Sequence, residues 1–195
     1  MAEMNQARRI VAMDNIEVIG IDHGWSQMKT VNAAVFSSGI REILTEPAFY
    51  DDVLEYDGKY YKVGTARETV MENKVENDDY YLLTLASVAK ELRIRGKSEA
   101  NVVLAVGLPA SRYGDEKQAF IDYLSKNEEV SFVFEQRKYH IKIVKVAVFP
   151  QCYAAVVDQI STFGQKVVVV DVGSWTIDIV PIINKKPDDS GFNTL

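Results

Sequence analysis

Two short segments carry the side chains best suited to chemistry, and each begins where an apolar strand reaches a turn. The first runs from Asp22 to Lys29 (DHGWSQMK). Gly24 lets the backbone bend sharply and lets a ligand approach closely. Such a turn offers backbone N–H groups and the Ser26 hydroxyl to an anion. Lys29 can reach a terminal phosphate, and Asp22 can hold a hydrated Mg²⁺. Taken alone, the pattern also fits an ordinary hairpin turn.

The second segment repeats the layout of the first much later in the chain. It runs from Asp171 to Asp178 (DVGSWTID), and as in the first case an apolar strand precedes it and another follows. A bare carboxylate at the end of an apolar strand is costly unless it is paired or bound to a metal. Two such hairpins facing each other would grip a triphosphate from both sides, with Asp22 and Asp171 near the metal ion.

The elements that must position these residues alternate between strands and helices. The hydrophobic pattern predicts strands over 17–22, 28–36, 101–107, 130–134, 139–149, 167–171 and 175–183. It predicts a short helix from about residue 66, an amphipathic helix that ends near Gly96, and further helices over 115–126 and 151–163. Mixed strands and helices with buried central strands indicate an α/β fold.

Length and composition exclude several classes of protein. The chain has 195 residues, enough for one domain with a sizeable core or for one and a fraction. With 47% hydrophobic and 26% charged residues, disorder is excluded as the main state. No apolar run is long enough to span a membrane. The net charge of −6 and the scattered basic residues argue against direct nucleic-acid binding. A single cysteine and the lack of a secretory signal predict a cytoplasmic location.

The paired motifs resemble those of the actin superfamily, which includes actins, sugar kinases and heat-shock chaperone ATPases. Asp22–Lys29 is similar to the first phosphate motif of that superfamily, and Asp171–Asp178 is similar to the second. Between them, Asn101–Pro109 (NVVLAVGLP) and Phe149–Gln151 (FPQ) resemble the ParM-type bacterial actin-like proteins, which form filaments that segregate plasmids. The likeness extends over about residues 17–183.

This resemblance implies an actin-like (ribonuclease H-like) mixed sheet flanked by helices, with ATP and Mg²⁺ as cofactors. Asp22 and Asp171 would organise Mg²⁺ through its waters, and Gln151 would orient the attacking water. The alternative for Gln151 is a helix-start residue that satisfies nearby backbone groups. The residues expected to line the phosphate loops are Gly24, Trp25, Ser26, Lys29, Gly173, Ser174, Trp175 and Thr176. The two tryptophans put bulky rings where the family usually has small residues, so they either point outward or narrow the pocket.

The resemblance also implies how the chain is divided and what it assembles with. Residues 1–16 would be a flexible N-terminal extension, 17–164 an actin-like N-terminal domain, and 165–195 the opening hairpin and tail of a truncated second domain. Because family members are longer, we expect a fragment of a filament-forming ATPase; the alternative is a naturally short protein. Its partners would be further copies of itself and a DNA-binding adaptor protein. Two other functions stay open: a non-catalytic actin-like interaction module and a small-molecule kinase of the same superfamily.

Overall fold

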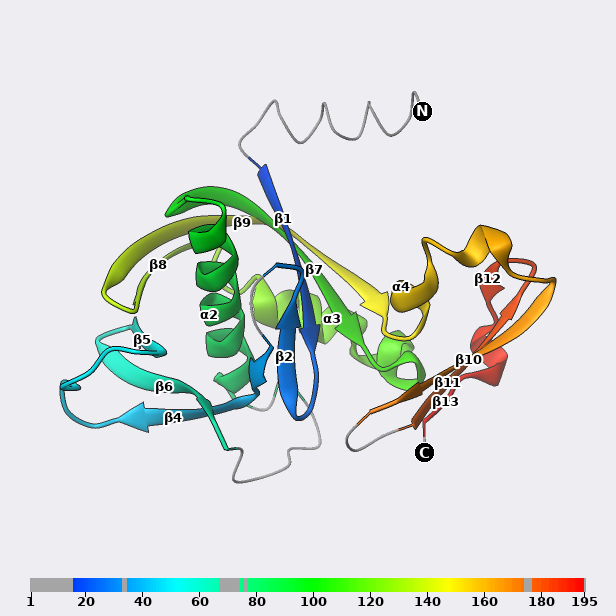
Figure 1. Ribbon diagram of the computed structural model, residues 1–195, viewed down its shortest axis with the longest axis horizontal. Coiled ribbons are helices and arrows are strands. Elements are labelled where there is room, and N and C mark those ends of the chain that lie inside the picture. The colour runs from blue at the N-terminus through cyan, green and yellow to red at the C-terminus, as the bar shows by residue number, and fades with distance from the viewer. Residues whose placement is uncertain (1–15, 33–34, 67–73, 76, 174–176, 195) are drawn as a thin grey trace.

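The computed structural model describes residues 16–32, 35–66, 74–75, 77–173 and 177–194. Within these residues, strands form one large mixed sheet and one smaller antiparallel sheet (Figure 1). The large sheet contains β1 (Ile16–His23), β2 (Gln27–Thr30), β3 (Phe36–Ser37), β4 (Gly39–Ile43), β5 (Val53–Tyr56), β6 (Lys59–Thr65), β7 (Glu99–Leu108), β8 (Glu129–Phe134) and β9 (Arg137–Pro150). The smaller sheet contains β10 (Lys166–Val172), β11 (Ile177–Ile183), β12 (Lys186–Pro187) and β13 (Asn193–Thr194). The described helices are α2 (Asp79–Ile94), α3 (Tyr113–Leu124) and α4 (Tyr153–Val156), with 3₁₀ turns over Ala110–Arg112, Ile160–Thr162 and Asp189–Gly191.

Three parallel strands at the centre of the large sheet determine which loops meet. The strand order is β3-β2-β1-β7-β9-β8-β5-β6-β4, and β7 pairs in parallel with both β1 and β9. Ile21 of β1 lies opposite Val106 of β7, and Leu108 of β7 lies opposite Pro150 of β9. The carboxyl ends of the three strands therefore reach the same edge of the sheet, although they are far apart in the sequence.

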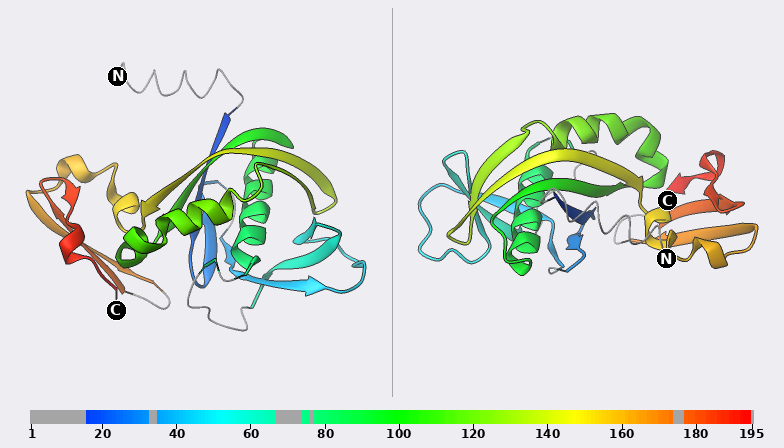
Figure 2. Two further views of the ribbon diagram at one scale, coloured as in Figure 1. Left: turned by 180° about the vertical axis from the view of Figure 1, so that it is seen from behind. Right: turned by 90° about the horizontal axis from the view of Figure 1, so that it is seen from above.

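Helix α2 is buried on nearly all sides because the large sheet curls around it (Figures 1 and 2). Twelve of its 16 residues are buried, and it contacts β1, β2, β4 and β8. Three of the buried residues are polar or charged, and two of them bond to the backbone of the helix itself: Thr84 donates to the Tyr80 carbonyl at 2.6 Å and Ser87 to the Leu83 carbonyl at 2.8 Å. The predicted amphipathic helix is therefore present, but it is buried on more than the one face that an amphipathic pattern implies.

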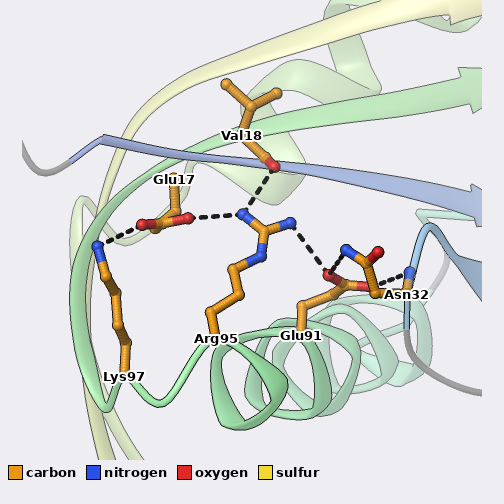
Figure 3. Close-up of polar contacts among 6 residues, drawn as sticks. All are labelled: Glu17, Val18, Asn32, Glu91, Arg95 and Lys97. Carbon is orange, nitrogen blue, oxygen red and sulfur yellow. Dashed lines mark hydrogen bonds and ion pairs between the residues drawn. The ribbon is translucent and has the colours of Figure 1, made fainter. Parts of the chain in front are cut away.

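A polar cluster fastens the C-terminal end of α2 to β1 and to the segment after β2 (Figure 3). The fully buried Glu91 carboxylate accepts hydrogen bonds from the backbone and side-chain nitrogens of Asn32 at 2.7 and 3.1 Å. It also pairs with Arg95 at 3.0 Å. Arg95 in turn reaches Glu17 at 2.6 Å, and Lys97 forms a second ion pair with Glu17. The cluster ties the start of β1 to the far end of the hairpin that carries Lys29.

The smaller sheet begins with a hairpin whose register pairs Asp171 with Asp178. A small apolar cluster attaches this sheet to the end of β9, and its buried members are Ala110, Cys152, Val180 and Ile182. Among the described strands, β10 pairs with β11 alone, and its Val168, Val170 and Val172 side chains are more than half exposed. The chain passes from the large sheet to the smaller one between β9 and β10. The predicted domain boundaries, 17–164 and 165–195, stay predictions.

Two expected helices have different outcomes. The helix predicted over 151–163 is wrong: the segment contains the single-turn α4 and, after a break, a 3₁₀ turn over Ile160–Thr162. β-Branched residues are frequent here, including Val156 and Val157, and they have low helix propensity. The helix expected from about residue 66 falls on 67–73, which lie outside the described residues. No helix in the described part of the chain is long and apolar enough to cross a membrane.

Candidate functional site

Asp22 lies near the end of β1, where two other residues singled out by the sequence contact it. The Gln151 side-chain amide donates a hydrogen bond from Nε2 to Oδ1 of Asp22 at 2.8 Å. The Lys29 Nζ lies 3.6 Å from the other carboxylate oxygen. Because β1 and β9 flank β7 in parallel, Gln151 arrives beside Asp22 just after β9 ends. The three side chains meet although the Gln151 and Asp22 positions are 129 residues apart.

Two glycines leave the space that this arrangement needs. A Cβ at Gly24 would lie 2.4 Å from the backbone oxygen of Gln27, so no other residue fits the first turn without moving the chain. A Cβ at Gly107 would lie 2.7 Å from Cγ of Gln151. The sequence pattern singled out Gly24 but not Gly107. The role of Gly107 depends on a contact between β7 and the residue after β9, which nothing local in the sequence reveals.

Both hairpins line a single cavity of about 290 Å³. The first hairpin contributes Asp22, Gly24, Trp25, Ser26 and Lys29; the second contributes Asp171 and Gly173, with Gln151 between them. A neighbouring, more apolar cavity of about 440 Å³ shares Asp22, Lys29, Gln151 and Asp171 with the first. Ser174, Trp175 and Thr176 lie outside the described residues. The geometry thus brings together the predicted residues that are described, while their roles stay predictions.

The ring of Trp25 packs against the N-terminal end of α2 instead of pointing into solvent. It meets the Tyr80 ring edge to face, with 6.3 Å between centroids. The Lys74 Nζ and the Arg112 guanidinium lie 5.5 and 6.0 Å from the centre of the indole. The Tyr80 hydroxyl also donates to the Gly24 carbonyl oxygen at 3.3 Å. Trp25 therefore forms a fixed, half-buried wall of the cavity.

Asp178 is a third carboxylate at the cavity, and the sequence indicated no role for it. It lies opposite Asp171 in the β10–β11 register, lines the cavity and is 5% exposed. Its place inside the second motif was the only signal in the sequence. Nearby, burial together with Asp178 and Asp171 raises the pKa of the Cys152 thiol to about 12. Cys152 is thus a protonated packing residue, not a nucleophile.

The donor set fits a hydrated magnesium ion better than a metal held by protein ligands alone. Among the described residues, no group of three or more His, Cys, Asp and Glu side chains is arranged to hold a metal. Asp22 and Asp171 do line one cavity as carboxylates that are open to solvent. Mg²⁺ keeps several of its waters and is commonly held by one or two carboxylates together with substrate phosphates. The two aspartates supply donors of that kind.

Comparisons with known proteins agree on the fold. Residues 20–153 match the family model of the N-terminal domain of actin-like proteins. Among solved structures, Ta0583, an archaeal actin homolog, is 21% identical with a TM-score of 0.74, and the match covers 91% of this chain and 61% of that one. The apo pSK41 ParM protein is 19% identical with a TM-score of 0.72, covering 93% and 66%. An AlfA filament bound to AMPPNP is 18% identical with a TM-score of 0.69, covering 91% and 69%.

These likenesses confirm the predicted actin-like mixed sheet with flanking helices. The chain spans 61% and 66% of the length of the first two of these structures. A search of curated proteins found no match.

Proposed function

Because the chain belongs to the actin-like proteins, with residues 20–153 as their N-terminal domain, we propose that it binds Mg-ATP between its two hairpins. In this proposal it is the N-terminal half of a ParM-type, filament-forming ATPase of plasmid or DNA segregation. The observation that carries the proposal is the cavity shared by Asp22 and Asp171, two carboxylates from separate sheets. Structural neighbours bound to AMPPNP and to ADP support a nucleotide as the ligand.

In this proposal, several residues around the cavity have roles that their contacts support. Gly24 keeps the first turn tight, so that its backbone N–H groups and the Ser26 hydroxyl can face phosphate oxygens. Lys29 would neutralise phosphate charge, and Asp22 and Asp171 would hold the waters of Mg²⁺. When bound, Mg²⁺ would supply positive charge at the phosphates during phosphoryl transfer.

Gln151 would orient the water that attacks the terminal phosphate. Its amide nitrogen is committed to Asp22, which leaves the amide oxygen to accept a hydrogen bond from water. A neutral amide is a weak base, so it contributes by positioning and not by removing the proton. The same hydrogen bond links the water-positioning residue to a proposed magnesium ligand.

Assembly into filaments is the second part of the proposal. Alp12 and AlfA are neighbours whose structures are filaments, and they support the proposed self-association. Nucleotide state would then control polymer stability, with a DNA-binding adaptor protein as partner in the cytoplasm. Light scattering of the chain with ATP, with ADP and without nucleotide tests assembly, which should increase with ATP.

Calorimetric titration with Mg-ATP tests the binding site. Asp171→Ala should abolish or strongly weaken binding, because it removes one of the two proposed magnesium ligands. Asp158→Ala is the matched control, since Asp158 is an exposed aspartate outside the cavity. Binding by the wild type and the control but not by Asp171→Ala would support the proposal. Absence of binding by the wild type would favour the non-catalytic interaction module.

The small-molecule kinase differs from the ATPase in its acceptor. Phosphate release from ATP in the absence of any added compound distinguishes a transfer to water from a transfer to a metabolite. Turnover that starts only when a hydroxyl-bearing metabolite is supplied would refute the ATPase and favour the kinase.

A further inference from the structure

Lys74 is a buried lysine whose ammonium lacks the partner that its burial calls for. The residue is 2% exposed, and Nζ forms no hydrogen bond or ion pair among the described residues. Lysine is almost never fully buried unless it is paired, because an unpaired buried charge is costly. Such a group in a folded protein calls for an explanation, and an absent ligand is one.

The position of this ammonium relates it to the cavity. It lies 5.5 Å from the centre of the Trp25 ring and 5.8 Å from that of Tyr80. Trp25 lines the cavity, and Tyr80 donates to the Gly24 carbonyl of the same turn. Lys74 therefore lies behind the first hairpin, where it supports the Trp25 wall through cation–π contacts.

The charged groups that face Lys74 leave its charge incompletely balanced. Burial lowers the pKa of Lys74 to about 8, while Asp22, Glu116 and Asp178 favour its charged form and Arg112 opposes it. Two of these carboxylates already have other partners. Asp22 is engaged by Gln151 and Lys29, and Glu116 pairs with Arg112 at 3.3 Å. A polyanion in the cavity beside Asp22 would add negative charge close to this ammonium.

We propose that Lys74 is a positioning residue for polyphosphate recognition. Its buried charge attracts the anion through the wall formed by Trp25, and its cation–π contacts hold that wall in place. The inference rests on the nucleotide site proposed above. In an interior of low effective dielectric such an attraction persists beyond contact distance. Its strength should therefore increase with the number of phosphates on the ligand.

Titration calorimetry of the whole chain with ATP, ADP and AMP, each with Mg²⁺, tests this assignment. Lys74→Met removes the charge and keeps the stem, and Lys74→Arg keeps the charge. Lys138→Met removes an exposed lysine outside the cavity and serves as the matched control. We expect Lys74→Met to weaken ATP binding about tenfold, ADP binding less and AMP binding little. Arginine keeps the positive charge and can also lie over an aromatic ring, so the arginine and control variants should stay within about twofold of the wild type.

The unfolding midpoint of the variants distinguishes the proposed positioning role of Lys74 from a purely structural role. Replacing an unpaired buried charge with an apolar side chain should leave the unfolding midpoint of Lys74→Met unchanged or raise it. Equal weakening for all three nucleotides, or failure of the methionine variant to fold, would show that Lys74 is a structural residue and overturn the inference. If the wild type binds ATP and Lys74→Met binds it equally well, the inference about Lys74 is overturned and the proposed function is not. If the wild type binds no nucleotide, the proposed function is refuted as well.

Discussion

Removal of the Glu91 carboxylate tests how α2 is fastened to the strands that carry the site. This fully buried group accepts hydrogen bonds from the Asn32 backbone nitrogen, the Asn32 amide and Arg95 (Figure 3). In Glu91→Ala all three donors lose their acceptor, and the lost side chain leaves a cavity. Arg95 keeps Glu17 and the Val18 carbonyl oxygen as partners.

The structure sets the size of the effect. Breaking a buried ion pair by removing one partner costs about 3–5 kcal/mol. The Arg95 side chain is 23% exposed and Asn32 is exposed, so water can partly solvate the donor groups that lose the Glu91 carboxylate. We therefore expect the lower end, a loss of about 3 kcal/mol in the free energy of unfolding. For a chain of this length that lowers the melting temperature by roughly 6–12 °C.

Urea unfolding followed by circular dichroism at pH 7 measures this loss. Glu91→Gln keeps an acceptor oxygen for Asn32 and should lose about half as much as the alanine variant. The matched control is Glu129→Ala, whose side chain is 60% exposed and lies 3.6 Å from its lysine partner; it should change stability by less than about 0.5 kcal/mol. If Glu91→Ala unfolds within about 1 kcal/mol of the wild type, the cluster does not fasten α2 as argued.

Two further variants address catalysis and acid stability. Gly107→Ala should slow phosphate release much more than it weakens ATP binding, because its Cβ would displace Gln151; equal losses in both assays would contradict this reasoning. Burial tends to raise the pKa of Glu17, but hydrogen bonds from Lys97 and Arg95 outweigh it and hold that pKa below its usual value. The stabilisation by Glu17 is thus present above about pH 4.5 and is lost as the pH falls through the lowered pKa. Urea titrations from pH 6 to 3 should show a shallower loss of stability for Glu17→Gln than for the wild type, and parallel curves would refute the assignment.

The sequence predicted much of the fold because many of its signals are local. The run from residue 101 to 107 is apolar throughout, as expected of a strand with neighbours on both sides, and it became the central β7. A turn joins the two strands predicted over 130–134 and 139–149, with Glu135 and Gln136 at positive φ between β8 and β9. These features depend on residues close together in the chain, so pattern and turn chemistry suffice to find them.

Features that depend on curvature or on distant contacts were not predictable in the same way. The burial of α2 follows from the curl of the whole sheet, and the hydrophobic periodicity of the helix does not indicate how strongly the sheet curls. The prediction of a helix over 151–163 was wrong because it gave too little weight to the low helix propensity of β-branched residues such as Val156 and Val157. Gly107, Asp178 and Lys74 became candidates only when the fold brought them to the cavity or behind its wall.

The contrast between local signals and distant contacts also explains why the repeated motif was informative about the site. A single aspartate–glycine turn is consistent with many hairpins, but two of them specify a geometric relation that coordinates can contradict. Parallel pairing of β1, β7 and β9 brings Gln151 to Asp22, and the hairpin of β10 and β11 then presents Asp171 to the same cavity. Because the two aspartates belong to different sheets, a change in how the sheets are oriented would alter their separation directly. In the proposed function, binding of a polyphosphate and its metal between them would therefore be coupled to that orientation.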